Sequence, residues 1–266
     1  MPGLSEPVSP EQPDAPFISL SGVRKVYRTR EGEVEAIRHV SMNVQAGELV
    51  SIVGPSGCGK STLLKILAGL HEHDEGEVRI GTAAEPFDPS RDIGMVFQQP
   101  LLLKWRRILQ NVLLPAEILG LNLREARERA RDLLHLVGLS DYADSYPYQL
   151  SGGMQQRAAI ARALVHDPKL VLMDEPFGAL DAMTRDRLNL ELLRIWRESG
   201  KTILFVTHGI QEAVFLGSHV AVMTARPAQL AEFIKVDLPR RQSLDVRTTE
   251  GFGEYARRIY HLLDFD

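Results

Sequence analysis

The sequence of 266 residues predicts an α/β protein with a largely parallel sheet, an antiparallel β subdomain and a helical insertion. Three observations lead to this fold class. An apolar run at 49–53 passes through a glycine-rich loop into a helical pattern, which is the local order of a phosphate-binding unit. Two more largely apolar runs, 169–173 and 202–207, are continuous enough for buried parallel strands, and polar residues follow each. Between residues 99 and 163 the pattern changes to helical spacing.

The composition is typical of a globular protein with a buried core. Hydrophobic residues make up 44% of the chain and charged residues 25%. The formal net charge of −4 gives no overall basic field, so we expect no nucleic-acid partner. A single cysteine, Cys58, excludes an internal disulfide and suits a reducing cytosol. No apolar run approaches the length of a membrane span, so we expect membrane association only through partners.

The first part of the chain predicts a tail and two strands. Residues 1–16 hold five prolines and no lysine or arginine, unlike a signal peptide, and we expect a disordered tail. Residues 17–27 and 35–44 alternate apolar and polar side chains, which predicts two antiparallel strands around the charged turn 28–33. Tyr27 closes the first strand, where it either packs on a purine or is merely half-buried.

The glycine-rich loop is Gly54-Pro55-Ser56-Gly57-Cys58-Gly59-Lys60-Ser61. Its glycines let backbone N–H groups point at phosphate oxygens, and the next helix adds its positive N-terminal end. We expect Lys60 to reach the β- and γ-phosphates and the Ser61 hydroxyl to bind Mg²⁺. Cys58 is either a redox switch or a residue that fills a backbone-determined position.

Residues 71–76, His-Glu-His-Asp-Glu-Gly, resemble a cluster of metal ligands. No regular element fixes these side chains, so a solvated turn is the better interpretation. A short strand at 77–80 and a buried strand at 92–97 follow, and Gln98 stands at the end of the latter.

The helical insertion contains two recognisable helices. In the first, an Arg- and Glu-rich run at 124–131 covers one face and Gly138 is the expected C-cap; the apolar face holds Ala126, Ala130, Leu133, Leu134 and Val137. Acids interrupt the basic run, so we interpret it as a solvated face. The second helix is expected at 154–165. Ser151 is a good N-cap there, and two glycines after it leave N–H groups open to an anion, although a plain capped helix has the same residues.

The run at 169–173 delivers Asp174 and Glu175 to the end of a buried strand. In phosphate-loop proteins a carboxylate there holds Mg²⁺, and Glu175 would face the attacking water. His208 follows the strand at 202–207, at the sheet edge where open α/β folds bind ligands, although a lone histidine there is usually structural. The turn at 177–181 precedes a helix whose core face holds Leu188, Leu192, Ile195 and Trp196.

The last part of the chain predicts a short helix from Gln211, a strand at 219–224 and a terminal helix. Six apolar residues fall on one face of the terminal helix, namely Phe252, Tyr255, Ala256, Ile259, Tyr260 and Leu263. We expect this face to pack against the domain.

Six motifs of this chain resemble those of ATP-binding-cassette transporter ATPases and occur in the same order. They are the phosphate loop, Gln98, Leu-Ser-Gly-Gly-Met-Gln at 150–155, Asp174-Glu175, Ala-Leu-Asp at 179–181 and His208. The resemblance runs from about Phe17 to Leu263. It implies a phosphate-loop NTPase core with a RecA-like sheet in a cassette domain at 17–266. The core with its β subdomain would occupy 17–98 and 164–240, the helical subdomain 99–163 and the C-terminal helix 241–266.

The resemblance also implies the roles of individual residues. Glu175 would be the general base, Gln98 would sense Mg²⁺ and the attacking water, and His208 and Lys60 would contact the γ-phosphate. Tyr27 would stack on adenine. The implied Mg²⁺ ligands are Ser61, Gln98 and Asp174. The implied ATP contacts are Tyr27, Gly54, Pro55, Ser56, Gly57, Cys58, Gly59, Lys60, Ser61, Thr62, Ser151, Gly152, Gly153, Gln155 and Asp181.

In such ATPases the 151–153 segment of one subunit completes the ATP site of another. The resemblance therefore implies a twofold dimer with a second copy of the chain and two ATP molecules between the copies. It also implies integral membrane permease subunits, an extracytoplasmic solute-binding protein that acts indirectly, and a place at the cytoplasmic face of the inner membrane.

Within the family, residues 100–106, 111–112, 224–227 and 236–240 are similar to importers of the nitrate, sulfonate and taurine group. Trp105 lies where such importers face the permease, or it packs the helical insertion. Gly209 departs from this group, which usually has an acid there, and is expected to loosen the His208 loop. Lys104 replaces a common proline.

Two other functions fit parts of the pattern. A soluble cassette ATPase in DNA repair or translation would usually show a long coiled-coil insertion or two cassettes, and neither is visible. A phosphate-loop kinase would have no need of the segment at Ser151. The solute itself, including a heterocycle precursor as an option, is not encoded in this chain if separate subunits recognise it.

Overall fold

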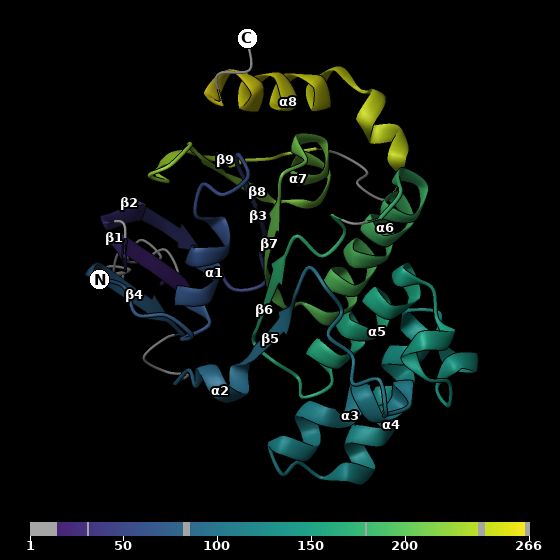
Figure 1. Ribbon diagram of the computed structural model, residues 1–266. Coiled ribbons are helices and arrows are strands. Elements are labelled where there is room, and N and C mark those ends of the chain that lie inside the picture. Colours follow the sequence, from purple (N-terminus) through teal and green to yellow (C-terminus); the bar gives the residue numbers. More distant parts are fainter. Residues whose placement is uncertain (1–14, 31, 82–85, 179, 239–242, 264–266) are drawn as a thin grey trace, which may run out of the picture.

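The structure is a computed structural model that describes residues 15–30, 32–81, 86–178, 180–238 and 243–263. Two sheets and the helices around them make up the described chain (Figure 1). The predicted α/β class with a parallel sheet and an antiparallel β subdomain is confirmed. In the described part, we find no helix that is both long and apolar enough to cross a membrane.

The smaller sheet is antiparallel and has the strand order β2-β1-β4. It consists of β1 (Ile18–Thr29), β2 (Gly32–Val44) and β4 (Glu75–Ile80). The two predicted N-terminal strands are present, but β1 continues for two residues beyond Tyr27, so Tyr27 does not close it. The expected turn at 71–76 is a loop only as far as Asp74, because β4 begins at Glu75, two residues earlier than predicted. The Asp74 carboxylate accepts a hydrogen bond from the Val26 amide at 2.6 Å.

The larger sheet has the order β5-β6-β7-β3-β8-β9. Its first five strands are parallel, and β9 pairs antiparallel with β8 at the edge. The strands are β3 (Leu49–Val53), β5 (Ile93–Val96), β6 (Leu170–Asp174), β7 (Thr202–Thr207), β8 (His219–Met223) and β9 (Leu230–Lys235). Strand β9 was not predicted from the sequence, because an edge strand that is only partly buried lacks a continuous apolar run.

The helices lie on both faces of the larger sheet. Figure 1 shows α1 (Lys60–Leu67) between the two sheets, and α5 (Gly152–Leu164), α6 (Ala182–Ser199) and α7 (Ile210–Leu216) on the opposite face of the larger sheet. The other helices are α2 (Pro89–Asp92), α3 (Ile108–Ile118), α4 (Leu123–Leu136) and α8 (Glu250–Leu262). Short 3₁₀ turns occupy Ser140–Tyr142, Pro147–Gln149 and Leu244–Thr248.

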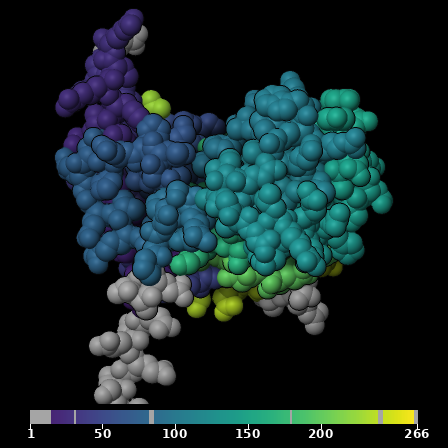
Figure 2. Space-filling view, turned by 90° about the horizontal axis from the view of Figure 1, so that it is seen from below, coloured from purple at the N-terminus to yellow at the C-terminus, as the bar shows by residue number. Residues whose placement is uncertain are grey.

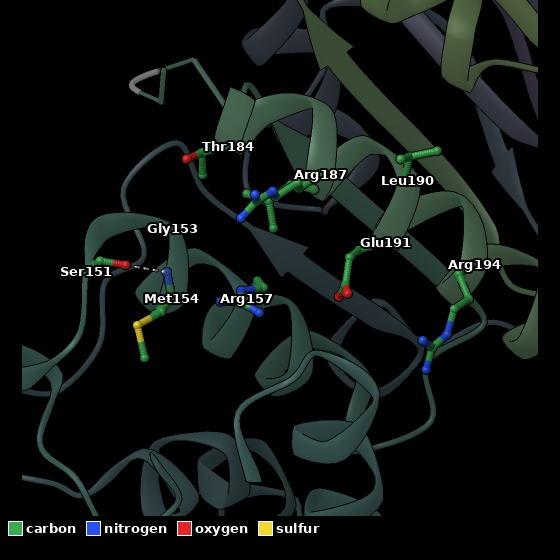
Figure 3. A pocket seen from close by; sticks show the side chains of 10 residues that line it. Ser151, Gly153, Met154, Arg157, Thr184, Arg187, Leu190, Glu191 and Arg194 are labelled. Carbon is green, nitrogen blue, oxygen red and sulfur yellow. Dashed lines mark hydrogen bonds between the residues drawn. The ribbon is translucent and has the colours of Figure 1, made fainter. Parts of the chain in front are cut away.

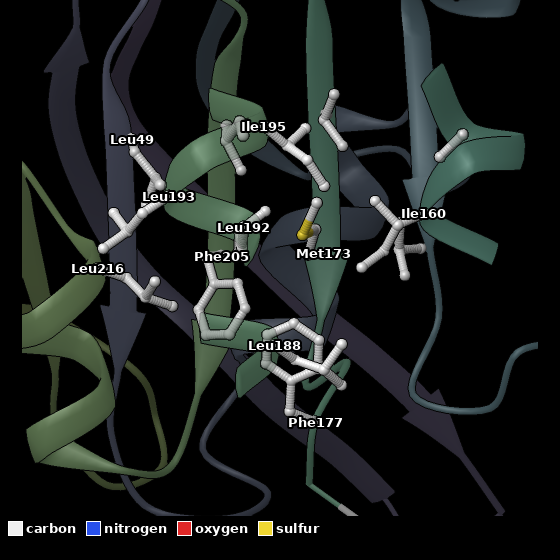
Figure 4. Close-up of a cluster of buried hydrophobic side chains, with 14 of the residues drawn as sticks. Leu49, Ile160, Met173, Phe177, Leu188, Leu192, Leu193, Ile195, Phe205 and Leu216 are labelled. Carbon is white, nitrogen blue, oxygen red and sulfur yellow. The ribbon is translucent and has the colours of Figure 1, made fainter. Parts of the chain in front are cut away.

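Side chains of the central strands alternate between two apolar clusters. Leu49, Met173 and Phe205 pack with α6 residues such as Leu192 on one face (Figure 4). The residues that alternate with them along the strands, such as Val50, belong to the second cluster, which also contains side chains of α1 and of the antiparallel sheet. Because both faces are covered, the strands have no polar face, which explains their continuous apolar runs.

The helical insertion forms its own lobe. In Figure 2 the blue-green and teal residues of α3, α4 and α5 gather beside the purple and blue residues of the N-terminal part. Helix α5 joins this lobe to the core, because its residues Ile160 and Ala163 are buried in the cluster that also contains strand β6.

Candidate functional site

The loop between β3 and α1 requires glycine at two positions. A Cβ atom on Gly54 would lie 2.4 Å from the Met223 carbonyl oxygen, and one on Gly59 would lie 2.6 Å from that of Ala36. Gly59 also has a φ of 136°, which side-chain-bearing residues rarely adopt. The loop is therefore a backbone cradle with little room for side chains, as a phosphate-binding loop needs. Arg226, which the sequence did not mark as a site residue, supports it by donating to the Gly57 carbonyl at 2.9 Å.

Lys60 begins α1 and is only 4% exposed. Its ammonium group lies across the loop and donates to the carbonyl oxygens of Gly54 and Pro55 at 2.8 and 2.9 Å. The Glu175 carboxylate is 3.9 Å away, at the limit of an ion pair. A buried cation with so little anionic compensation is suited to a phosphate, so the cradle fits the ligand that the sequence predicts.

Ser61 and Asp174 meet at the edge of the larger sheet. The Ser61 hydroxyl donates to the Asp174 carboxylate at 2.8 Å, although 113 positions separate the two residues. Burial raises the pKa of Asp174, the nearby Glu175 charge acts in the same direction, and the Ser61 hydrogen bond acts against it. A hydroxyl and a carboxylate are hard oxygen donors, so the pair fits Mg²⁺.

Glu175 takes an unusual backbone conformation. Its φ of 45° lies in the left-handed region, and its amide continues the sheet by donating to the Val206 carbonyl at 3.0 Å. Such conformations cost free energy and are found mainly where the fold places a functional side chain. Here the carboxylate lies between the Lys60 ammonium and the His208 ring, whose Nδ1 is 3.5 Å from Oε2.

Gln98 and His208 converge on the same place. A Cβ atom on Gly178 would lie 3.6 Å from the Gln98 amide nitrogen and 3.7 Å from the His208 ring carbon. The structure thus brings Gln98, Glu175 and His208 together from three strand ends. Gly178 was not predicted as a site residue, and its signal in the sequence is a glycine three residues after Glu175.

Tyr27 lies beside the start of α1. Its hydroxyl makes a long hydrogen bond of 3.4 Å to the Thr62 hydroxyl, and its ring contacts His71 edge to face with 5.9 Å between centroids. The Tyr27 ring is partly exposed next to the loop helix, which is compatible with a stacking role. Cys58 is 2% exposed and packs in the apolar cluster on the α1 face, so packing accounts for its place in the loop.

The segment Ser151–Gly153 lies outside this cluster. Ser151 caps α5 by accepting a hydrogen bond from the Met154 amide at 3.3 Å, and the helix starts at Gly152, two residues earlier than predicted. Ser151 and Gly152 are exposed. Among the described residues, no hydrogen bond or ion pair connects this segment with the phosphate loop. The Gln155 amide is bound within the chain, to the Pro147 and Leu150 carbonyls at 3.0 and 3.1 Å.

A groove of about 550 Å³ runs from this segment between α5 and α6 (Figure 3). Its lining is Ser151, Gly153, Met154, Arg157, Thr184, Arg187, Leu188, Leu190, Glu191 and Arg194. The exposed residue Asp181 caps α6 at the same end by accepting from the Thr184 amide at 3.0 Å, which lowers its pKa. Ser151 and Asp181, the predicted ligand residues at the starts of α5 and α6, are therefore both exposed on the surface of the described chain.

The family model described as "ABC transporter" matches residues 37–178. An uncharacterised ABC transporter ATP-binding protein of Methanocaldococcus jannaschii is 45% identical over 92% of this chain and 91% of its own. A taurine import ATP-binding protein of Pseudomonas aeruginosa is 44% identical over 88% of this chain and 90% of its own. An aliphatic sulfonates import ATP-binding protein of Bacillus cereus is 39% identical over 91% and 94%.

A solved structure has the same fold. It is a dimeric post-hydrolysis state of an ATP-binding cassette bound to ADP and phosphate, with a TM-score of 0.71 and 37% identity. The match covers 83% of this chain and 99% of that one.

Proposed function

This chain belongs to the ABC transporter family and is one of its ATP-binding ATPase subunits, and from that membership we propose that it drives an importer. The imported solute would be small and anionic or rich in nitrogen or sulfur, of the nitrate, sulfonate or taurine type. One observation carries this proposal: the relatives named for taurine and aliphatic sulfonate import align with nearly the whole chain. An importer for another solute, such as a heterocycle precursor, is the second candidate.

Side chains at the strand ends and at the start of α1 would together perform hydrolysis. Glu175 is the proposed general base and would take the proton of the attacking water on its carboxylate, which already lies 3.5 Å from the His208 ring. Lys60 would bind the β- and γ-phosphates, and His208 the γ-phosphate. Ser61, Asp174 and Gln98 would hold Mg²⁺, which neutralises phosphate charge when bound.

The exposed start of α5 supports a shared site. Ser151 and Gly152 are exposed, and in the described chain no hydrogen bond connects this segment with the phosphate loop. We therefore propose that Ser151, Gly152 and Gly153 bind the γ-phosphate held by a second copy. Asp181, at the exposed start of α6, would lie in the same interface. The resulting dimer would hold two ATP molecules and separate after hydrolysis.

The segment after Gln98 supports contact with a membrane permease. It leads to a groove of about 380 Å³ near α3, beside which Leu101 and Ile118 are 54% and 74% exposed. Trp105 is also 74% exposed, so it does not pack the helical insertion. Large exposed apolar side chains mark interaction surfaces. We propose that the permease binds here and thereby keeps the chain at the cytoplasmic face of the membrane, with the solute-binding protein on the other side.

Arg162 couples this surface to α5. Its guanidinium donates to the carbonyls of Leu101 and Pro100, both at 2.7 Å, and its burial lowers its pKa. Since Ser151 lies at the other end of α5, one rigid helix joins the proposed permease contact to the proposed contact with the second copy.

The first test is light scattering of Glu175→Gln with and without Mg·ATP. Removing the base should leave ATP binding intact and stop hydrolysis, so an ATP-dependent dimer should accumulate. Changing Ser151 to a bulky residue in the same background should prevent it. A protein that binds ATP but stays monomeric even with its permease present would contradict the shared site.

The solute is tested by growth. Deleting the gene should impair growth on taurine or alkanesulfonates as sole sulfur source, or on nitrate as sole nitrogen source, and Ile118→Asp should impair it without changing ATP binding. Unchanged growth of the deletion strain on all three compounds would contradict the solute class. A soluble ATPase of DNA repair or translation would instead retain its function without any permease.

A further inference from the structure

The loop that carries His208 is fastened by two side chains with no assigned role. The Gly209 amide donates to the Thr207 hydroxyl at 2.9 Å, and that hydroxyl donates to the Glu212 carboxylate at 2.5 Å. Thr207 and Gly209 are the two neighbours of His208. The relay therefore fixes the backbone on both sides of the histidine, although the His208 side chain itself is 49% exposed.

This relay differs from the expectation for Gly209. The sequence predicts a looser loop, because a glycine stands where an acid is usual. The Gly209 amide is instead hydrogen-bonded, and a Cβ atom on Gly209 would lie 3.5 Å from the Thr207 hydroxyl and 3.8 Å from the nearer Glu212 oxygen. An acidic side chain at 209 would thus approach the Glu212 carboxylate. Because residue 209 is a glycine, the Glu212 carboxylate has no second carboxylate beside it at this position.

The relay borders a cavity that α6 lines from the other side. Glu212 and Asn189 line this cavity of about 610 Å³ together with His208 and Gly209. Asn189 is fully buried beside Glu212, but within the described chain its amide atoms and the outer Glu212 oxygen make no hydrogen bond of good geometry. Burial raises the pKa of Glu212. The Thr207 hydroxyl, the Asn189 amide and the charges of Arg185 and His208 act against this shift. The other charged groups lining the cavity, Asp186 and Arg247, pair with each other at 2.6 Å.

A buried carboxyl among polar groups that are not fully paired is costly for folding, which is unusual away from functional sites. The observed contacts give it one clear task. We propose that Glu212 is a positioning residue for His208, acting through the Thr207 hydroxyl and the Gly209 amide. The Glu212 oxygen can accept from Thr207 whether or not the carboxyl is protonated, so the task does not depend on its charge. The proposal rests on the role in hydrolysis that we propose for His208.

The test compares two threonines of β7. Thr207 and Thr202 are 3% and 2% exposed, and each hydroxyl accepts a hydrogen bond of 2.9 Å from a glycine amide, that of Gly209 and of Gly47 respectively. Thr207→Val and Thr202→Val therefore each remove one buried hydroxyl, at opposite ends of the same strand. Only Thr207 is next to His208. Glu212→Ala breaks the relay at its other end, while Thr207→Ser and Glu212→Gln preserve its hydrogen bonds.

Thr207→Val and Glu212→Ala should each lower kcat for ATP about 10- to 100-fold with KM changed less than twofold, since they displace His208 without touching the phosphate loop. The histidine NMR signal of His208, assigned by its absence in His208→Gln, should shift in both variants. Thr202→Val, Thr207→Ser and Glu212→Gln should keep kcat within about threefold and leave the signal in place.

Equal losses in Thr207→Val and Thr202→Val, or a loss without a shift of the His208 signal, would overturn the positioning role. Should one of the two relay variants fail to fold, the other still decides. The NMR signal needs no hydrolysis, so it reports on positioning even if the wild-type chain proves inactive on ATP. That last result would contradict the proposed function rather than the relay.

Discussion

The phosphate loop and the start of α5 are both glycine-rich segments that lead into a helix. They differ in how many of their polar groups are bonded to other parts of the same chain. At the loop, Lys60 is buried and bound to two carbonyls, and Ser61 is paired with Asp174 across the sheet. At α5, Ser151 only caps its own helix, and Gly152 is exposed. The loop is thus assembled before ligand binding, whereas the α5 start offers amides that nothing in the described chain uses. From this difference we expect that one copy is enough for ATP binding and that hydrolysis needs two.

The largest effect should come from Lys60→Ala. Removing the buried ammonium leaves the phosphates without their charged partner, which costs about 2–5 kcal/mol and should weaken ATP binding at least 30-fold. Titration with a fluorescent ATP analogue measures this, and Lys65→Ala on the next turn of the same helix is the control. If a single copy of the Lys60 variant still bound ATP normally, the loop would not be the site completed within one chain.

Gly152→Ala tests the other region. A Cβ atom there would meet nothing closer than a Leu180 methyl at 4.0 Å, so the free chain has room for it. Alanine also favours a helix more than glycine does, and thermal stability should stay equal or rise. If a second copy needs close approach at this position, hydrolysis should nevertheless fall about 10-fold or more while ATP affinity is unchanged. Normal hydrolysis in this variant would remove the case for a shared site.

Asp174→Asn should separate stability from activity. Because burial raises the pKa of Asp174, its charged form is disfavoured in the folded chain. At neutral pH the variant should be more stable than the wild type by no more than about 1 kcal/mol, since the group is partly solvated. This advantage should shrink as the pH falls through the raised pKa, where the wild-type carboxyl becomes neutral. Thermal unfolding without nucleotide at several pH values measures it, and Mg²⁺-dependent hydrolysis should be lost.

The smallest effect should come from Tyr27. If its ring stacks on adenine, Tyr27→Leu should weaken ATP binding by about 1 kcal/mol, or roughly fivefold. Tyr27→Phe should bind ATP within twofold of the wild type, because the lost hydroxyl makes only a long hydrogen bond of 3.4 Å to Thr62. An equal loss in both variants would assign the effect to that hydrogen bond instead of the ring.

The sequence by itself determined the parts of the fold that local patterns encode. Glycines at 54 and 59 and the apolar runs around them specify a strand, a tight loop and a helix, because only glycine tolerates those backbone positions. Periodicity likewise gave the buried strands and the α6 core face, on which Trp196 is only partly buried and donates to the Gly47 carbonyl at 2.9 Å. Periodicity did not predict β9, because that strand forms through its pairing with β8 and has no regular apolar pattern of its own.

Only the tertiary structure decided how the functional side chains meet. Strand order brings Ser61 to Asp174, and it brings Gln98 and His208 together beside Gly178, although these residues are far apart in the sequence. The relay from Glu212 to Gly209 forms where the end of β7 meets the start of α7. Burial of Lys60 and the left-handed backbone of Glu175 are likewise properties of the packed molecule. The physical reason is that a motif specifies local conformation and chemistry, whereas distance, burial and strain arise only when the whole sheet is assembled.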